Sequence, residues 1–255
     1  MCWAGKIHLA AAAALCAALL AIPLRGSAQE ERKTTLRGND EIVTETLSVG
    51  DFTELHTRGM FNVTFVQSGP GEKARAEVTT SSNIVPFVTA ETKDGVLTLG
   101  MSEKHRYFVK KIQVTVWAPV LRGAVVQGAG DLLIPDGLAT DAFEAVVKGA
   151  GNLSVGEMDV DGKVSFLIQG AGDIRAEAVE AETLGAEVQG AGGITLSGID
   201  ATDVSAVIKG AGGIVLSGKA GSAVLKLLGA GSIDIRALKA DNYDVSRSGI
   251  GKVKR

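Results

Sequence analysis

A three-residue phrase, Gly-Ala-Gly, recurs at a nearly fixed interval through the second half of this 255-residue chain. Its copies begin at Gly128, Gly149, Gly170, Gly190, Gly210 and Gly229, with a Gly-Ile-Gly variant at Gly249. Successive copies are 19 to 21 residues apart. A repeat of this length indicates an architecture in which each unit is one small module that needs its neighbours to bury a core.

Each copy is flanked by apolar residues at alternate positions. Two residues before the first glycine stand Val126, Val147, Ile168, Val188, Ile208 and Leu227. Four residues after it stand Leu132, Leu153, Ile174, Ile194, Ile214 and Ile233. A period of two with many β-branched side chains predicts strands, and helical spacing is absent.

Stacked units can satisfy both their apolar faces and their backbones if each strand pairs with its counterpart about 4.8 Å away. The sequence therefore predicts an all-β fold, a parallel β-helix or β-solenoid with rungs of about 20 residues. The glycines are expected at a shared corner, where they relieve positive-φ strain and crowding between adjacent corners. The pattern leaves open whether the alanine between them faces inward or outward.

An irregular β-rich half is expected over residues 49–122. Asp94-Gly95 separates two alternating runs and predicts a hairpin turn, and Pro119 is expected to end the strand before it. No Pro- or Ser-rich linker divides this half from the regular rungs at 123–255. We therefore expect one continuous β domain over 49–255.

One stretch of the first half matches the repeat in frame and is interpreted as a degenerate rung. The aligned pairs are Gly59 with Gly128, Asn62 with Asp131, Val63 with Leu132, and Phe65 with Ile134.

The first 28 residues predict a secretory signal peptide. An apolar run over 9–22 follows Lys6, and the small residues Gly26 and Ala28 fit a cleavage site before Gln29. The run is shorter than the roughly 20 residues that a membrane span needs, so a retained anchor is the weaker alternative. Lipidation at Cys16 is a second alternative, disfavoured by the bulky residue before it. Residues 29–48 are expected to form a flexible extension.

Composition restricts the classes of partner. Both cysteines, Cys2 and Cys16, lie in the expected signal, so the processed chain would hold no disulfide. The formal charge is −3 and becomes more negative on processing, which argues against nucleic acid and anionic membranes as partners. Aromatic residues make up only 4%, too few for base-stacking platforms.

The order of motifs resembles a bacterial family of unknown function described as "Putative auto-transporter adhesin, head GIN domain". The motifs are "DFTELHTRGMFNVTFVQ", "DGVLTL", "KIQVTVWAPVL" and then the ladder of Val-x-Gly-Ala-Gly phrases, over about 49–254. The resemblance implies a right-handed β-helix-like fold and an exported, envelope-associated protein, periplasmic or at the cell surface. It carries no catalytic residues over to this chain.

The Gly-Ala-Gly phrase lacks the strand-to-helix context and the lysine of a phosphate loop. The residues that follow it could form an outward calcium-binding ladder, yet turn chemistry explains them better. They are Asp131, Asn152, Asp173, Gly193, Gly213 and Ser232.

Two of these carboxylates support an enzymatic alternative. Asp131 and Asp173 would be two rungs apart, roughly 9 to 10 Å, close to the separation of about 6.5 to 9.5 Å in inverting glycosidases. A polysaccharide hydrolase or lyase of β-helix type is therefore the alternative function. Asn152 between them, and no further carboxylate or histidine recurring nearby, argue against it.

The remaining candidates favour structural roles. His56 and His105 are read as surface histidines, so no metal site and no cofactor are expected. Trp117 is expected to be buried at a strand end, with stacking on a sugar as the alternative.

An outward polar ladder, in which Gln separates the lysines, is expected at Gln127, Lys148, Gln169, Gln189 and Lys209. Lys252, Lys254 and Arg255 are expected to guard the open end of the stack.

These observations favour a non-enzymatic exported envelope protein, an adhesin-like or scaffold β-solenoid that presents a rigid face to a glycan, a surface or a protein. No catalytic, cofactor-binding or metal-ligating residue is assigned. No membrane span is expected after signal removal, and self-association is left open.

Overall fold

The computed structural model describes residues 34–255. The expected signal peptide, with Cys2 and Cys16, and residues 29–33 lie outside the described residues.

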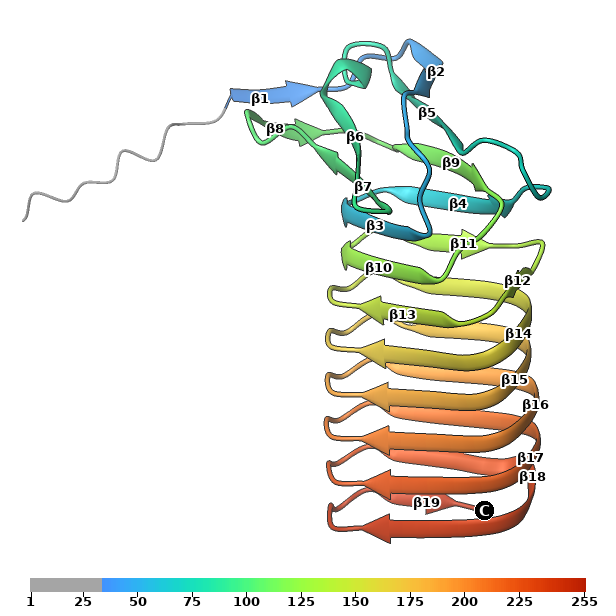
Figure 1. Cartoon of the computed structure of the whole chain (residues 1–255). Helices are drawn as coiled ribbons and strands as arrows, with labels where there is room; N and C mark the ends of the chain where they lie inside the picture. The colour runs from blue at the N-terminus through green and yellow to red at the C-terminus, as the bar shows by residue number, and fades with distance from the viewer. Residues whose placement is uncertain (1–33) are drawn as a thin grey trace, which may run out of the picture. The chain divides into compact units, whose positions relative to one another are not determined.

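The second half of the chain is a right-handed coil of parallel strands stacked one above another (Figure 1). Together with the rungs before them, the long strands complete a β-solenoid of about seven turns. The long strands are β14 (Leu153–Ile168), β15 (Ile174–Val188), β16 (Gly193–Ile208), β17 (Gly213–Leu227) and β18 (Ser232–Arg247). The predicted fold class is confirmed.

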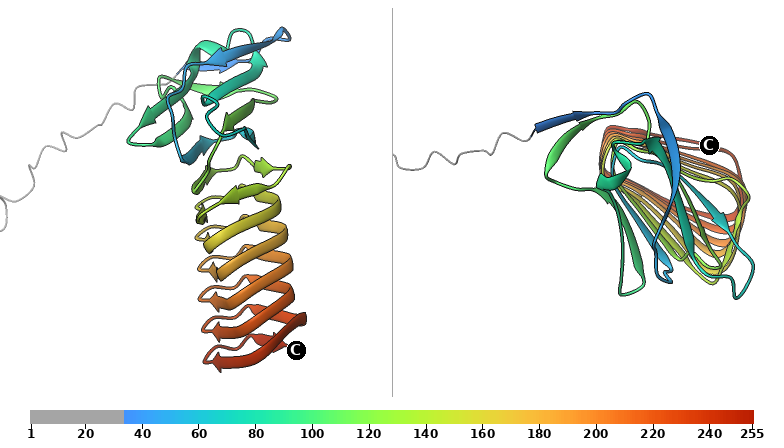
Figure 2. Two further views of the ribbon diagram at one scale, coloured as in Figure 1. Left: turned by 45° about the vertical axis from the view of Figure 1, so that its right-hand side comes forward. Right: turned by 90° about the horizontal axis from the view of Figure 1, so that it is seen from above.

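Each long strand bends, so that one turn of the coil has three paired segments. In β15 the first segment is 174–176, the second 179–181 and the third 183–188, each paired in parallel with β16. The Gly-Ala-Gly corner then leads into the next turn (Figure 2).

The interior consists of like residues stacked in register. Ile174, Ile194, Ile214 and Ile233 pair from rung to rung on the first segment, and each is fully buried. Burying one such side chain stabilises the fold by about 1.5–3 kcal/mol. The alternating apolar positions of the sequence are therefore the core.

The Gly-Ala-Gly corners stack backbone on backbone. A Cβ on Gly170 would lie 2.0 Å from the carbonyl oxygen of Gly149, and one on Gly172 would lie 1.8 Å from that of Gly151. Among the described Gly-Ala-Gly copies only Gly128 has a positive φ, at 134°. The glycines are thus required by close approach of successive turns, and the expected positive-φ strain applies to a single corner.

The alanine of each corner faces outward. Ala129, Ala150, Ala171, Ala191, Ala211 and Ala230 are all exposed, whereas the second glycine of each phrase is buried. This settles the orientation that the sequence pattern left open.

The regular coil begins with four short strands, and the degenerate rung lies directly above them. The short strands are β10 (Gly123–Gly128), β11 (Leu132–Ile134), β12 (Leu138–Thr140) and β13 (Phe143–Val147); the degenerate rung is β3 (Glu54–Gly59) and β4 (Asn62–Gln67). Gly128 pairs with Gly59 and Leu132 with Val63. The in-frame alignment of these segments is confirmed.

Antiparallel strands cover the first end of the coil. Strand β5 (Arg75–Ser81) pairs with both β2 (Ile42–Leu47) and β9 (Gln113–Ala118), and β9 pairs in parallel with β4. The hairpin of β6 (Val88–Lys93) and β7 (Val96–Met101) turns at Asp94-Gly95, as predicted. The remaining elements are β1 (Thr34–Arg37), β8 (His105–Phe108) and the 3-10 helix η1 (Val85–Phe87).

Residues 34–47 lie within the expected flexible extension, yet they form β1 and β2. Strand β1 pairs with β8 and β2 with β5. These two strands are therefore part of the β structure, and β2 closes an edge that β5 would otherwise expose.

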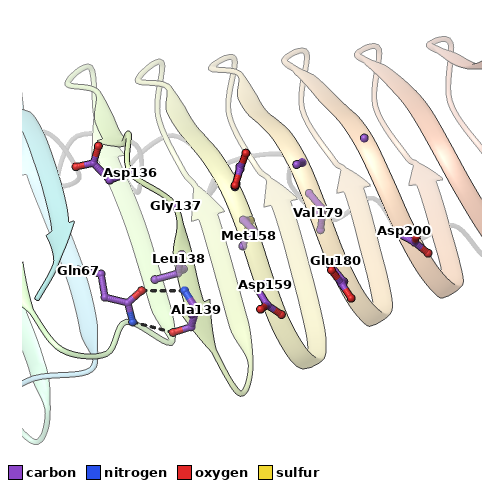
Figure 3. Close-up of a pocket in the computed structure, with 13 residues that line it drawn as sticks. Gln67, Asp136, Gly137, Leu138, Ala139, Met158, Asp159, Val179, Glu180 and Asp200 are labelled. Carbon is purple, nitrogen blue, oxygen red and sulfur yellow. Dashed lines mark hydrogen bonds between the residues drawn. The ribbon is translucent and has the colours of Figure 1, made fainter. Parts of the chain in front are cut away.

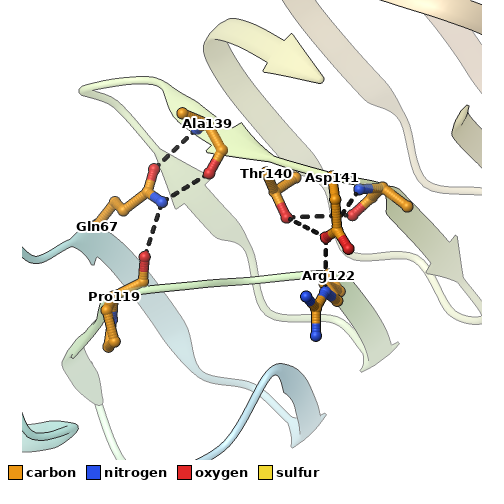
Figure 4. Close-up of polar contacts among 7 residues, drawn as sticks. Gln67, Pro119, Arg122, Ala139, Thr140 and Asp141 are labelled. Carbon is orange, nitrogen blue, oxygen red and sulfur yellow. Dashed lines mark hydrogen bonds and ion pairs between the residues drawn. The ribbon is translucent and has the colours of Figure 1, made fainter. Parts of the chain in front are cut away.

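One side chain fastens the degenerate rung to the first regular one (Figure 4). The Gln67 amide donates to the carbonyls of Pro119 and Ala139, at 2.8 and 2.7 Å, and accepts the Ala139 N–H at 2.8 Å. Arg122 Nε lies 2.6 Å from Asp141 Oδ1 in the same region. These contacts hold β12 in place although it spans only three residues.

A short strand and a tyrosine cover part of the C-terminal edge. Strand β19 (Lys252–Lys254) pairs with only the start of β18. Farther along, the Tyr243 hydroxyl accepts the Ala240 N–H at 2.8 Å and donates to the Leu238 carbonyl at 2.9 Å. The side chain thereby occupies backbone groups that could otherwise pair with another strand.

Replacing Gly172 by alanine is expected to destabilise the coil by about 3 kcal/mol or more, because its Cβ would collide with the backbone of the preceding turn. The matched control is Gly185→Ala, whose Cβ would have no atom nearer than 3.8 Å. Thermal melting should show a large loss for the first variant and no loss for the second. Equal melting temperatures would contradict the backbone-contact explanation.

Asp234 makes stability depend on pH. The Arg236 side chain, bonded at 2.7 Å, and the Arg236 N–H lower the pKa of Asp234 from 3.8 to about 2. Because folding lowers this pKa, the carboxylate stabilises the fold fully above about pH 4 and loses that effect as the pH falls toward 2. Urea unfolding should therefore show Asp234→Asn as less stable than the wild type at neutral pH. The difference should shrink as the pH falls through about 2, and a difference of undiminished size there would contradict this assignment.

Candidate binding face

One flat face of the coil carries side chains in regular rows. It is formed by β10, β13 and the third segments of β14 to β17, and we call it the Gln/Lys face. Its outermost row is the exposed ladder of Gln127, Lys148, Gln169, Gln189 and Lys209. The predicted outward orientation of these residues is confirmed.

Two further rows lie beside the ladder. The middle row contains the half-buried residues Val125, Val146, Leu167, Glu187 and Val207. The third row is mostly small, with Gly123, Glu144, Ser165, Gly185 and Ser205. The face therefore combines a row of hydrogen-bonding groups, an apolar strip interrupted by Glu187, and a row of mostly small side chains.

A hollow of about 270 Å³ lies over the third row, where that row has its smallest side chains. Gly185 is at its centre in the register, between Ser165 and Ser205, and Leu167 and Glu187 also line it. A Cβ on Gly185 would touch nothing closer than 3.8 Å. This glycine is therefore not required by backbone crowding and leaves surface space instead.

The polar groups of the face are connected. Gln169 donates to Gln189 at 3.3 Å, Gln189 donates to Glu187 at 2.8 Å, and Lys209 Nζ lies 2.7 Å from Glu187 Oε1. Hydrogen bonds from Lys209 and Gln189 lower the pKa of Glu187. This network holds the amide groups of Gln169 and Gln189 at the surface, and Lys209 balances the charge of Glu187.

His56 continues the middle row onto β3, opposite Val125. Its Nε2 lies 3.6 Å from Glu54 Oε2. Burial lowers the pKa of His56 despite the opposing effect of Glu54, and the cations Arg58 and Lys148 lower it further. His56 is therefore a half-buried group whose surroundings favour the uncharged form.

The first three residues of the ladder that follows the corners, Asp131, Asn152 and Asp173, each have a structural role. Asp131 Oδ1 accepts the N–H of Asn152 at 3.0 Å, Asn152 Oδ1 that of Asp173 at 3.0 Å, and Asp173 Oδ1 that of Gly193 at 2.9 Å. Each side chain thus satisfies a backbone donor one turn further on. The turn-chemistry interpretation accounts for this ladder, and neither Asp131 nor Asp173 lines the hollow at Gly185.

Two other expectations need revision. Trp117 is half-exposed on β9, because Val116 and Ala118 take the inward positions, and the Arg75 guanidinium stacks 4.4 Å above its ring. His105 is half-buried between Phe87 and Tyr107, with ring centroids 5.1 and 6.1 Å away. His105 is therefore not a freely exposed histidine.

Two of the larger hollows elsewhere on the coil differ in their lining. One, of about 700 Å³, follows the corners of the last turns and includes Ala211, Ile250 and Lys252. The corner N–H groups of Ala191 and Ala211 bond to carbonyls of the preceding turn at 3.0 Å, so these donors are not available to a phosphate. The other, of about 580 Å³, lies on the second segments and is lined by acidic residues (Figure 3).

Comparison with known proteins gives the family. A family model described as "Putative auto-transporter adhesin, head GIN domain" matches residues 51–178 and 164–254. The chain belongs to this head GIN domain family. No curated protein matches it.

Solved structures of the same fold cover most of the chain. An adhesin from Bacteroides fragilis, itself named only provisionally, shares 25% identity with a TM-score of 0.77, covering 86% of this chain and 99% of its own. A provisionally named lipid binding protein from Parabacteroides distasonis shares 18% identity with a TM-score of 0.75, covering 87% and 99%. In the described part of this head GIN chain, no helix has the length and apolarity to cross a membrane.

Sequence reasoning missed the apolar strip, the hollow at Gly185 and the acidic row on the second segments. The signal was present in the repeat spacing. Aligning the copies places Asp159, Glu180 and Asp200 at one position, and Ser165, Gly185 and Ser205 at another.

Asp173→Ala is expected to lower the free energy of unfolding by about 1–2 kcal/mol, because the Gly193 N–H loses its acceptor. Asp173→Asn keeps an oxygen at this position and should cost less. Urea unfolding of the two variants checks the difference. A smaller loss for alanine than for asparagine would contradict the ladder's structural role.

Proposed function

We propose that this head GIN domain protein is a non-enzymatic, adhesin-like binding protein of the cell envelope, and that the Gln/Lys face binds a glycan. The observation that carries the proposal is the combination on one face of an amide and lysine ladder, an apolar strip and a hollow. Membership of a family described as adhesins supports the binding role.

The chemistry of the face suits a linear polysaccharide. Sugar hydroxyls both donate and accept hydrogen bonds, and Gln side chains offer both kinds of partner. The ladder repeats at the strand spacing of about 4.8 Å, comparable to the length of one sugar unit. An extended glycan lying along the coil axis would therefore meet equivalent groups on successive rungs, with its apolar ring faces over the middle row.

A rigid face lowers the cost of such binding. The side chains of the middle row are held by strands that pair on both sides, so little conformational freedom remains to be lost. Many weak contacts along a repeating ligand can then add up to useful affinity.

The enzymatic alternative, a hydrolase or lyase using Asp131 and Asp173, has less support. One oxygen of each carboxylate accepts a backbone N–H, and Asp173 also binds Arg175 at 2.9 Å. Neighbouring structures are named as adhesins or binding proteins. Incubating the protein with polysaccharides and measuring reducing ends tests the alternative directly.

Export is part of the proposal and rests on the signal-like first 28 residues. Sequencing the N-terminus of the protein recovered from cells should give Gln29. A start at Met1 in the mature protein would contradict cleavage.

Gly185→Tyr is expected to weaken glycan binding at least about tenfold, because the ring would fill the hollow without disturbing the backbone. The matched control is Thr195→Tyr, which adds a ring on the first segment, on a different face. Binding of the purified protein and both variants to a glycan array, followed by calorimetry on the best ligand, makes the measurement.

The array is run beside phospholipid vesicles, since one structural neighbour is named a lipid binding protein. Equal weakening by both substitutions, or binding to vesicles but to no glycan, would contradict the proposal.

A further inference from the structure

A second outward row, distinct from the Gln/Lys face, runs along the second segments of the coil. It contains Asp159, Glu180, Asp200, Lys219 and Lys239, paired in register from one rung to the next. All five side chains are exposed. Figure 3 shows the three carboxylates at equivalent places on successive strands.

The signs in this row are segregated, with three acidic rungs followed by two basic ones. Like charges directly opposite each other on adjacent strands are destabilising. The Gln/Lys ladder avoids this by placing glutamine between its lysines, and other carboxylates such as Asp173, Glu187 and Asp234 have a cation within 2.9 Å. In residues 34–255, none of the five residues of the segregated row takes part in an ion pair.

The carboxylates form a ridge between two hollows. One hollow of about 580 Å³ and another of about 550 Å³ are both lined by Asp159, Glu180 and Asp200. The rows on either side of the ridge point inward and are buried, for example Val179 and Ala181. A partner surface could therefore contact the charged row without disturbing the core.

We propose that this row is a self-complementary interface between two copies of the chain with antiparallel coil axes. A twofold axis along the strand direction, midway between the rungs of Asp200 and Lys219, places Asp200 opposite Lys219 of the second copy. It also places Glu180 opposite Lys239 of the second copy. Each pair forms twice by symmetry, because both copies use the same patch.

Because the two copies have the same strand spacing, their charged rows match rung by rung. Both rows repeat at about 4.8 Å, so aligning one pair aligns the next. In a row of alternating signs each charge would have opposite neighbours in the same copy, whereas a segregated row gains opposite partners when a reversed copy lies against it. Asp159 falls one rung beyond the overlap, since β18 is the last strand with a second segment.

The outward-facing residues two positions before and after the row on each strand affect the strength of the contact. Ala178 and Ala237 are small and would face each other, which allows close approach. On the other side, Glu182 would face Asp241 of the second copy, a like-charged pair. Exposed ion pairs contribute little individually, so the dimer is expected to be weak and sensitive to salt.

The test is sedimentation velocity of the purified protein over a range of concentrations, at low salt and at about 1 M salt, where the Debye length is about 3 Å. The wild type should dimerise at low salt and dissociate at high salt. Asp200→Lys should raise the dimer dissociation constant at least about tenfold. The double variant Asp200→Lys with Lys219→Asp should restore dimerisation, because each exchanged pair is rebuilt across the twofold axis.

Asp159→Lys is the matched control, with the same charge change one rung outside the overlap, and it should leave the dimer in place. Thermal melting confirms that every variant is folded. A wild type that stays monomeric at low salt overturns the proposal. So do a control that weakens the dimer as much as Asp200→Lys and a double variant that fails to restore it.

Discussion

The whole coil depends on contact between the backbones of successive glycine corners. A carbonyl oxygen of one corner occupies the space that a Cβ of the next would need, as for Gly149 against Gly170. The same carbonyl accepts the Ala171 N–H at 2.9 Å. Slipping one rung by a single residue would bring an alanine Cβ into this space, so the corners fix the register of every turn.

Because the register is fixed, residues at the same position of successive repeats lie in a row along the coil. The core rows can be uniform because apolar like-on-like stacking is favourable. The outward rows contain charged and polar side chains, and two rows illustrate how these groups are accommodated. Asp131, Asn152 and Asp173 accept N–H groups of the next turn, whereas the Gln/Lys ladder keeps its cations apart.

The two ends of a solenoid are its exposed edges, and this chain treats them unequally. The first end is covered by antiparallel strands that begin with β2 and β5. At the other end the Tyr243 hydroxyl occupies two backbone groups of β18, and the residues around it are charged. At this second end β19 pairs with only residues 232–234 of β18, so charged side chains rather than strand pairing guard the rest of the edge against other copies.

The sequence by itself determined the class of fold and the internal rungs, because a period of two around a recurring glycine corner is compatible with few other structures. It also placed the degenerate rung at Gly59 and the hairpin at Asp94-Gly95, since both depend on local residue types. Only the tertiary structure decided that the corner alanines face outward and that, of the two expected reasons for the corner glycines, crowding applies throughout whereas positive φ applies only at Gly128. Bends within each rung change the alternation of inward and outward residues, and a one-dimensional pattern does not record where they occur. The repeat spacing aligns the residues of the hollow at Gly185 and of the segregated charge row, but the stacked turns were needed to show that each set shares an exposed surface.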